Sequence, residues 1–528
     1  MEQIKIENLS FQYSLAEEKS LKNINLCIAE GEYVVLCGRS GCGKTTLLRQ
    51  LKSEIAPKGK TEGIVLFNGC GLAEISAYDR AQKIGFVMQN PESQIVTDKV
   101  WHELAFSLES LGLKTDEIRL RVAEMAAYFG IEEWFDGKTA ELSGGQKQLL
   151  NLASVMAAHP DVLILDEPTS RLDPIAAERF LSTVDRINKD LGVTVIITEH
   201  RLENILQYAD RLVIMEKGEI IAETEPKNIG KSIATLPESV MLGLPAAARI
   251  FIALGANGET PLSVRDGRVW LKKQGFKKTK IKHDEKSFDE KNAVELKNIS
   301  FRYEKNFADI LKSLNLKIPK GCVFALLGGN GAGKTTLSKI LLGAEKPYSG
   351  KLKLNGSICA MPQEVQTLFA SKTVEDELAE VEDNDEKIRA VEKKTGVTEL
   401  MKKHPFDISG GEQQRAALAK ILLCERDIYL FDEPTKGMDA EFKCTFAEII
   451  KELARSGKTV IIISHDIEFC AENAELCAML FDGEIAAVGT AKRFFDGNRF
   501  YTTAANKISK GFVDGAVTDK DVMEWLKE

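Results

Sequence analysis

The chain repeats itself once, and this duplication constrains its fold more than any other feature of the sequence. The two copies are about 290 residues apart, which is far too long for a solenoid repeat and indicates two copies of one domain. Four segments recur in the same order: IKIENLSFQY (4–13) as VELKNISFRY (294–303), GRSGCGKTTL (38–47) as GGNGAGKTTL (328–337), LSGGQKQ (142–148) as ISGGEQQ (408–414), and LILDEPT (163–169) as YLFDEPT (429–435).

The repeat also predicts the domain boundaries. We expect a first domain over 1–229, a linker over 230–292, a second domain over 293–499 and a C-terminal segment over 500–528. The linker contains an apolar stretch and then a lysine-rich run, KKQGFKKTKIKHDEK. That run has the charge to touch anionic lipid, but its composition favours a solvated, flexible linker.

Each copy is predicted to form an α/β domain. Short apolar runs flanked by helical patterns indicate buried strands, and strands that alternate with helices imply a parallel sheet. The predicted strands are 33–38, 162–167 and 193–198 in the first copy, and 323–328, 428–433 and 459–464 in the second.

Composition describes the class of protein but not its chemistry. Hydrophobic residues make up 44% of the 528 residues and charged residues 28%, which is ordinary for a soluble globular protein. The net charge of −9 gives no support to a nucleic-acid-binding surface, so no nucleic acid is expected as a partner. MEQIKIENLS lacks the pattern of a secretory signal, and no apolar run is long enough to span a bilayer. The ten cysteines form no CxxC pair, which is typical of reduced thiols in a cytosol.

Both copies contain a phosphate-binding loop of the pattern G-x-x-x-x-G-K-[ST], placed between an apolar strand and a helical pattern. The glycines let backbone N–H groups wrap around phosphates, the lysine reaches the β- and γ-phosphates, and the first threonine places its hydroxyl on Mg²⁺. These features predict ATP and Mg²⁺ as cofactors. The candidate ATP-binding residues here are Gly38, Ser40, Gly41, Gly43, Lys44, Thr45 and Thr46, with Gly328, Asn330, Gly331, Gly333, Lys334, Thr335 and Thr336 in the second copy.

An acidic pair ends one predicted strand of each copy: Asp166-Glu167 and Asp432-Glu433. The aspartate can hold Mg²⁺ and the glutamate can polarise the attacking water, so Glu167 and Glu433 are candidate catalytic residues. A lone Asp-Glu pair would more simply be a solvated turn. Its recurrence downstream of a phosphate-binding loop in both copies favours the catalytic interpretation.

The third motif is Ser-Gly-Gly before a helical pattern, which alone is only a helix cap. Together with the phosphate-binding loop and the acidic pair, in this order, it resembles the ATP-binding-cassette (ABC) ATPases over nearly the whole chain, twice. The resemblance implies two tandem P-loop nucleotide-binding domains, each with a RecA-like core, an antiparallel β subdomain and a helical subdomain.

The resemblance implies roles for further residues. Gln89 and Gln363 match the glutamines that contact Mg²⁺, and His200 and His465 match the histidines that contact the γ-phosphate. Asp173 and Asp439 match the aspartates that link the cassettes, and Tyr13 and Tyr303 match the aromatic residues that stack on adenine. A histidine with a structural role, or a tyrosine on the inner face of a strand, remains an alternative. The implied Mg²⁺ ligands are Thr45, Asp166, Gln89, Thr335, Asp432 and Gln363.

In this family two cassettes face each other head to tail, here within one chain. ATP at Lys44 is then capped by Ser409 and Gly411, and ATP at Lys334 by Ser143 and Gly145. We hypothesise that both sites hydrolyse ATP, because both copies keep the catalytic residue types. Three departures from the family pattern bear on this hypothesis: Ile408, Glu412 and Arg171.

QNPESQ (89–94), the stretch 97–113, ITEHRLE (197–203), 361–378 and the C-terminal 500–528 are similar to energy-coupling-factor (ECF) importer ATPases. This similarity implies a peripheral protein on the cytoplasmic face of the cell membrane, docked on a T-component and a substrate-binding S-component. Vitamins or metal ions are the implied cargo. The unequal stretches 90–142 and 364–408 predict two non-equivalent docking grooves.

An ATPase of another ABC importer class remains the alternative. A soluble two-cassette translation or ribosome factor is disfavoured, because the linker is partly apolar and Cys27 is the only cysteine in the first 29 residues.

Overall fold

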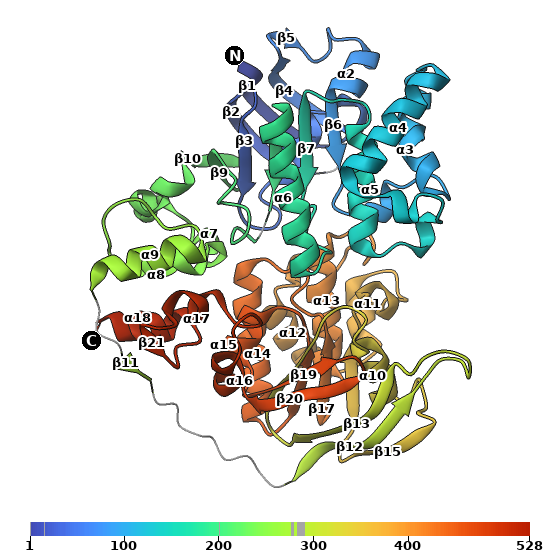
Figure 1. Cartoon of the computed structure of the whole chain (residues 1–528), viewed down its shortest axis with the longest axis vertical. Helices are drawn as coiled ribbons and strands as arrows, with labels where there is room; N and C mark the ends of the chain where they lie inside the picture. The colour runs from blue at the N-terminus through green and yellow to red at the C-terminus, as the bar shows by residue number, and fades with distance from the viewer. Residues whose placement is uncertain (1, 15, 200, 276–278, 282–290, 528) are drawn as a thin grey trace. The chain divides into compact units, whose positions relative to one another are not determined.

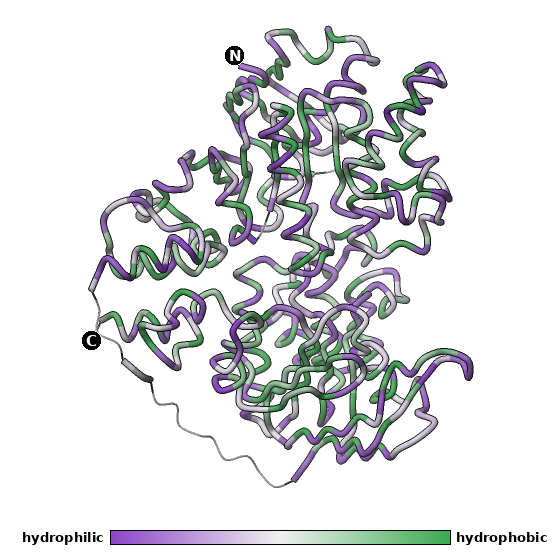
Figure 2. Tube along the Cα trace, in the orientation of Figure 1, coloured by the Kyte–Doolittle hydropathy of each residue, from purple (hydrophilic) through white to green (hydrophobic). Residues whose placement is uncertain are grey.

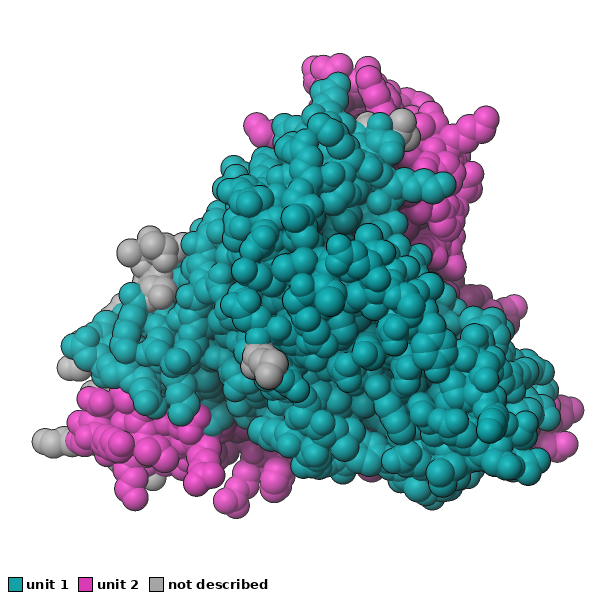
Figure 3. All heavy atoms as spheres, turned by 90° about the horizontal axis from the view of Figure 1, so that it is seen from above, with its two compact units in different colours: residues 1–263 teal, residues 264–528 magenta. Residues whose placement is uncertain are grey.

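The computed structural model describes residues 2–14, 16–199, 201–275, 279–281 and 291–527. It divides the chain into two compact units, Met1–Ser263 and Val264–Glu528 (Figures 1 and 3). The boundary between the units falls inside the predicted linker 230–292, whose lysine-rich part lies largely outside the described residues. None of the helices in the described stretches has the length and apolar character needed to span a bilayer.

The first unit contains two sheets. The smaller is antiparallel in its paired strands, with the order β2-β1-β4-β5: β2 (Leu21–Ala29), β1 (Glu2–Tyr13), β4 (Gly59–Phe67) and β5 (Cys70–Gly71). The larger has the order β10-β9-β3-β8-β7-β6 and is parallel except for β10: β10 (Glu219–Thr224), β9 (Arg211–Glu216), β3 (Tyr33–Cys37), β8 (Thr194–Thr198), β7 (Val162–Asp166) and β6 (Ile84–Val87).

The helices of the first unit fall into three groups. Some accompany the parallel sheet, others form the helical part between β6 and β7, and two follow β10. The helices are α1 (Lys44–Gln50), α2 (Ala77–Lys83), α3 (Val100–Ser110), α4 (Thr115–Phe129), α5 (Gly144–Met156), α6 (Pro174–Leu191), α7 (Glu238–Gly243) and α8 (Ala246–Ala253).

The second unit repeats this plan. Its small sheet has the order β13-β12-β15: β13 (Leu311–Pro319), β12 (Asn292–Phe301) and β15 (Ser349–Leu354). Its large sheet has the order β16-β17-β18-β14-β19-β20: β16 (Ile358–Met361), β17 (Ile428–Asp432), β18 (Thr459–Ile463), β14 (Val323–Leu327), β19 (Leu476–Phe481) and β20 (Glu484–Thr490). Its helices are α9 (Val264–Gln274), α10 (Lys334–Leu341), α11 (Val374–Ala379), α12 (Asp385–Thr395), α13 (Gly410–Leu423), α14 (Ala440–Arg455), α15 (Ile467–Asn473), α16 (Ala491–Gly497), α17 (Ala504–Ser509) and α18 (Asp519–Lys527).

The predicted α/β fold and its six buried strands are confirmed, and their apolar runs have a simple cause. Ile428 and Leu430 of β17 pack with the small sheet and α10, whereas Tyr429 and Phe431 pack with α13 and α14. Because both faces of a parallel sheet are covered, the strand is hydrophobic at successive positions rather than at alternate ones. Hydrophobic residues accordingly concentrate along the central strands (Figure 2).

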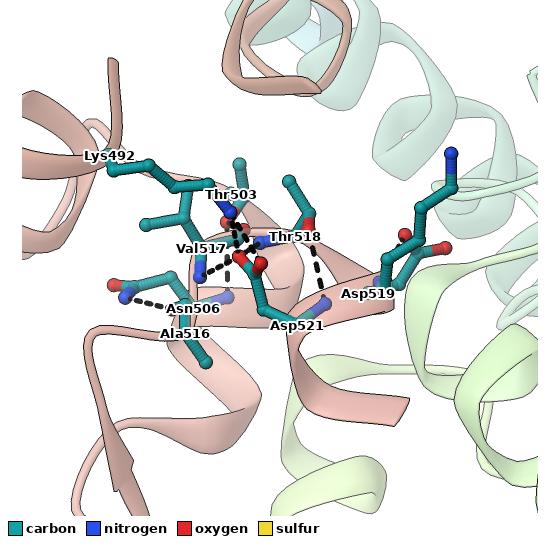
Figure 4. Close-up of polar contacts among 9 residues, drawn as sticks. Lys492, Thr503, Asn506, Ala516, Val517, Thr518, Asp519 and Asp521 are labelled. Atoms are coloured by element: carbon teal, nitrogen blue, oxygen red, sulfur yellow. Dashed lines mark hydrogen bonds and ion pairs between the residues drawn. The ribbon is translucent and has the colours of Figure 1, made fainter. Parts of the chain in front are cut away.

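The C-terminal segment folds together with part of the predicted linker. Arg268 of α9 donates to the carbonyl of Lys507 in α17 (2.6 Å) and to that of Lys510 just after this helix (3.1 Å). The short strand β11 (Thr279–Lys280) pairs in parallel with β21 (Val513–Asp514). The N-terminus of α18 is fixed by Asp521, whose carboxylate accepts from the backbone N–H groups of residues 517 and 518 (Figure 4). Residues on both sides of the second domain therefore form one packed region.

Candidate active site

The phosphate-binding loops connect β3 to α1 and β14 to α10, and their glycines are required by shape. Gly38 has φ +151°, and a Cβ there would lie 2.2 Å from the carbonyl oxygen of Met215. Gly328 has φ +159°, and a Cβ there would lie 2.4 Å from the carbonyl oxygen of Leu480. Only glycine fits such positions. Gly43 and Gly333, at the helix N-caps, are also left-handed.

The loop lysines fold back over the loops in the same way. Lys44 Nζ donates to the carbonyls of Gly38 (2.9 Å) and Arg39 (3.0 Å). Lys334 Nζ donates to the carbonyls of Gly328 (2.9 Å) and Gly329 (3.0 Å). Each ammonium is buried beside a helix N-terminus, an environment that favours an anion such as a phosphate.

In the first unit the acidic pair is tied to the loop through hydroxyl groups. Thr45 and Thr198 each donate to Asp166 Oδ1 over 3.0 Å. Burial raises the pKa of Asp166 and the charge of Glu167 raises it further, while the two hydroxyl groups act in the opposite direction. Hydroxyl and carboxylate oxygens side by side are ligands that Mg²⁺ prefers, so these residues fit the predicted metal.

In the second unit this network differs. β-sheet register pairs Asp166 with Thr198 but Asp432 with Ile463, so the hydroxyl that donates to the first aspartate has no counterpart at that position. Burial raises the pKa of Asp432 to about 6, with the neighbouring Glu433 adding to the shift and Lys334 opposing it. The two aspartates therefore stand in different electrostatic surroundings.

The glutamates that follow have a left-handed backbone, with φ +43° at Glu167 and +51° at Glu433. Such strain in a non-glycine residue is typical of functional sites. Both side chains are buried, and each has a specific partner: Gln89 Nε2 donates to Glu167 Oε2 (2.7 Å), and His465 Nδ1 lies 2.8 Å from Glu433 Oε2. His200 lies outside the described residues, and Gln363 is exposed after β16.

The tyrosines lie beside the loops rather than in the core. Phe11 is fully buried, whereas Tyr13 and Tyr303 are 36% and 48% exposed. The hydroxyl of Tyr13 hydrogen-bonds with that of Thr46 (2.9 Å), and Tyr303 makes the same contact with Thr336 (3.4 Å). Each tyrosine ring also makes an edge contact with the preceding phenylalanine, Phe11 or Phe301, so stacking on adenine stays a prediction beside the packing alternative.

The Ser-Gly-Gly motifs cap α5 and α13. The backbone N–H groups of Gln146 and Glu412 donate to the Ser143 and Ser409 hydroxyls (3.3 and 3.4 Å), and both helices have a complete capping box. Both serines are exposed, and Gly145 and Gly411 are partly exposed. In the second unit Ser409 Oγ also donates to the Glu412 carboxylate over 2.7 Å.

The predicted linking aspartates are also helix caps. Asp173 Oδ1 accepts from the N–H groups of Ile175 (3.0 Å) and Ala176 (2.9 Å) at the start of α6. Asp439 Oδ1 accepts from the N–H group of Phe442 (2.8 Å) at the start of α14. These contacts give both residues a local structural role that the sequence interpretation did not include.

Sequence reasoning missed two buried residues beside the first acidic pair. Thr198 accepts from the Glu167 N–H (2.9 Å), and Glu199 accepts from the hydroxyl of Thr169 over 2.7 Å. The signal that would have identified them is the difference between the repeats, in which ITEH (197–200) is replaced by IISH (462–465).

Comparisons with known proteins agree with this geometry. The profile of the ABC transporter family matches residues 21–170 and 311–436. A Bacillus cereus protein described as an ABC transporter ATP-binding protein is 40% identical, over 98% of this chain and 97% of that protein. A Methanosarcina mazei protein with the same description is 33% identical, over 93% of this chain and 90% of that protein.

A solved structure of an archaeal ribosome recycling factor with a ribosomal stalk protein is similar in fold. Its TM-score is 0.61 at 20% identity, over 93% of this chain and 91% of that chain. The duplicated phosphate-binding loops, the acidic pairs, the capped Ser-Gly-Gly helices and the full-length relatives lead to one conclusion. The chain is a two-cassette, ATP-hydrolysing member of the ABC transporter family.

Proposed function

We propose that this protein is the ATPase subunit of an ABC importer of the ECF type, which powers uptake of a vitamin or a metal ion through membrane partners. The observation that carries the proposal is the match over 98% of the chain to a relative described as an ABC transporter ATP-binding protein. The ECF assignment is supported by the sequence QNP that begins at Gln89 and by the packed C-terminal region. Another ABC importer class is the alternative.

The proposed catalytic residues act around Mg²⁺–ATP. Thr45, Asp166 and Gln89 would hold the metal in the first cassette, and Thr335, Asp432 and Gln363 in the second. When bound, Mg²⁺ neutralises charge on the phosphates. Lys44 and Lys334 bind the β- and γ-phosphates, and the rings of Tyr13 and Tyr303 receive the adenine.

Glu167 and Glu433 accept a proton from the attacking water, and Gln89 and His465 position these carboxylates through the two contacts described above. His200 has the corresponding proposed role in the first cassette. The Ser143 and Ser409 motifs then cap the ATP of the opposite cassette, so that closure excludes water.

The helical segments that would receive the membrane partners differ in character. In the first cassette α3 exposes the aromatic side chains of Trp101 (37%) and Phe106 (38%). In the second, the first turn of α11 exposes the acidic side chains of Glu375 and Asp376. These surfaces support the proposal that the two docking grooves take different partner segments.

Affinity purification of the tagged chain from detergent-solubilised membranes tests the proposal. We expect integral membrane proteins to co-purify with the chain, and Trp101→Asp to release the chain from membranes. Leu120→Asp, at an exposed position of α4, is the matched control and should leave membrane binding unchanged. Recovery with ribosomes in place of membrane proteins would establish the soluble-factor alternative instead.

A further inference from the structure

Two cysteines lie near the C-terminal end of α13 in the second cassette. Cys359 is in β16, and Cys424 is the C-cap residue directly after α13, which packs against β16. Both residues are free thiols and both are partly exposed. A small oxidant therefore has access to this pair, in contrast to the fully buried cysteines of the sheet.

The contacts of these thiols place them together. Cys359 Sγ donates to the carbonyl of Ile428 (3.9 Å), and Cys424 Sγ donates to the carbonyl of Lys420 (3.5 Å). Each thiol also interacts with the other and shifts its pKa. Tyr429 pairs with Cys359 across the sheet, and burial raises the pKa of its hydroxyl to about 12.

The surroundings make the two sulfurs chemically different. The interaction with Cys359, helped by the charges of Arg426 and Lys420, lowers the pKa of Cys424 to about 7. The same interaction, together with burial, raises the pKa of Cys359. A large fraction of Cys424 is thus ionised near neutral pH and can act as the nucleophile, whereas Cys359 keeps its proton.

The first cassette has no such pair. When β6 and α5 are matched to β16 and α13, Gly85 corresponds to Cys359 and Ala158 corresponds to Cys424. A Cβ at Gly85 would lie 2.5 Å from Val155 Cγ1, so the space that holds the Cys359 side chain in one cassette is filled by packing in the other. The dithiol is therefore not part of the shared ATPase chemistry.

We propose that Cys359 and Cys424 form a peroxide-sensitive modification site that closes to a disulfide and fixes the C-terminal end of α13 to β16. The Cys424 thiolate attacks one peroxide oxygen, and the O–O bond breaks to give a Cys424 sulfenic acid and hydroxide, which takes a proton from solvent and leaves as water. The Cys359 sulfur then attacks the sulfenic sulfur, the S–S bond forms and the S–O bond breaks, releasing a second water. Two thiols are oxidised and one hydrogen peroxide is reduced.

The position of this bond gives it a consequence for turnover. α13 begins beside Ser409 and β16 leads to Gln363, so the disulfide joins the elements that carry two proposed contacts of the ATP cycle. Fixing them restrains their relative movement and slows hydrolysis. This consequence rests on the proposed roles of Ser409 and Gln363, whereas formation of the bond does not.

The test exposes the reduced, full-length protein to hydrogen peroxide, followed by alkylation in denaturant, peptide mass spectrometry and ATPase assay. We expect a peptide linked through Cys359 and Cys424, a fall in free thiols from the ten of the sequence to eight, and several-fold slower ATP hydrolysis that dithiothreitol restores. Cys359→Ser and Cys424→Ser should each abolish the linked peptide and the slow state. Cys70→Ser, which removes an exposed cysteine of the first cassette, should behave like the unsubstituted protein.

Absence of the linked peptide at peroxide doses that oxidise Cys70 would overturn the proposed site. A linked peptide without slower hydrolysis would overturn its regulatory consequence. Failure to co-purify membrane proteins would affect the importer proposal alone, since the disulfide and its ATPase readout are measured on the purified chain.

Discussion

Nδ1 of His465 lies 2.8 Å from Oε2 of Glu433 in the second cassette. In the first cassette it is the Gln89 amide that donates to the equivalent carboxylate, at Glu167. The two proposed catalytic glutamates are therefore both buried, and among the described residues each has a side-chain partner that can position it.

Replacing either glutamate tests whether both sites hydrolyse ATP. We expect Glu167→Gln and Glu433→Gln each to remove about half of the activity or more, and the double variant to lose about 100-fold or more, because a general base contributes about 10²–10⁴-fold. Phosphate release at saturating ATP measures this, with Glu219→Gln on exposed β10 as the control. If either single variant kept nearly full activity, the hypothesis of two active sites would be wrong.

Thr198 should stabilise the first cassette through its hydroxyl group. Thr198→Val removes one of the two hydroxyl donors to Asp166 and leaves the Glu167 N–H with only the backbone carbonyl of residue 198 as acceptor. The loss of two hydrogen bonds should cost about 1–3 kcal/mol. Ile463→Val at the matched position of the second cassette removes only a methylene, which costs about 0.5–1.5 kcal/mol. Thermal unfolding compares the two variants, and hydrogen exchange at β7 locates the effect. A smaller loss for Thr198→Val than for Ile463→Val would contradict the role of the hydroxyl.

Asp432 should make the metal-free protein less stable as pH rises. Its pKa is about 6 in the folded chain, above its ordinary value, so the folded state holds the proton more tightly. The protonated Asp432 side chain contributes roughly 3 kcal/mol to the free energy of unfolding below pH 4, and this contribution is lost as the pH rises through 6. Asp432→Asn should therefore be more stable than the unsubstituted chain at pH 7.5, with the gain vanishing near pH 4. Unfolding midpoints in chelator without nucleotide measure this; a pH-independent difference would contradict it.

Asp521 should show the opposite pH dependence. Burial raises its pKa, but Lys492 and the backbone N–H groups of Thr518 and Val517 outweigh burial and lower it overall. Its contribution to stability is present above the ordinary aspartate pKa and is lost as pH falls below about 4. Asp521→Asn should destabilise the C-terminal region at pH 7 and cost less at lower pH. Limited proteolysis followed by mass spectrometry reports the opening of 500–528, and unchanged cleavage at pH 7 would contradict this expectation.

The sequence predicted the parallel sheets because strands such as 428–433 are apolar at successive positions, and a duplicated motif order left little freedom in topology. The sequence also located the phosphate-binding loops, because only glycine can adopt the backbone angles that these loops require. The different partners of Asp166 and Asp432 were not predictable, since they depend on which residue of the neighbouring strand lies opposite. The Cys359–Cys424 pair was hidden for the same reason: 65 positions separate its members in the sequence, and only sheet and helix packing joins them.

The pairing of β11 with β21 determines where this protein can be cut. A break after Ser263 leaves Arg268 with the carbonyls of Lys507 and Lys510 and keeps both strands on one polypeptide. A break just before β12, which looks natural from the repeat alone, would take α9 and β11 away from the region they complete. For co-expression of the halves, or for exchange of cassettes between relatives, the useful junction is therefore at 263–264, well upstream of the start of the second repeat.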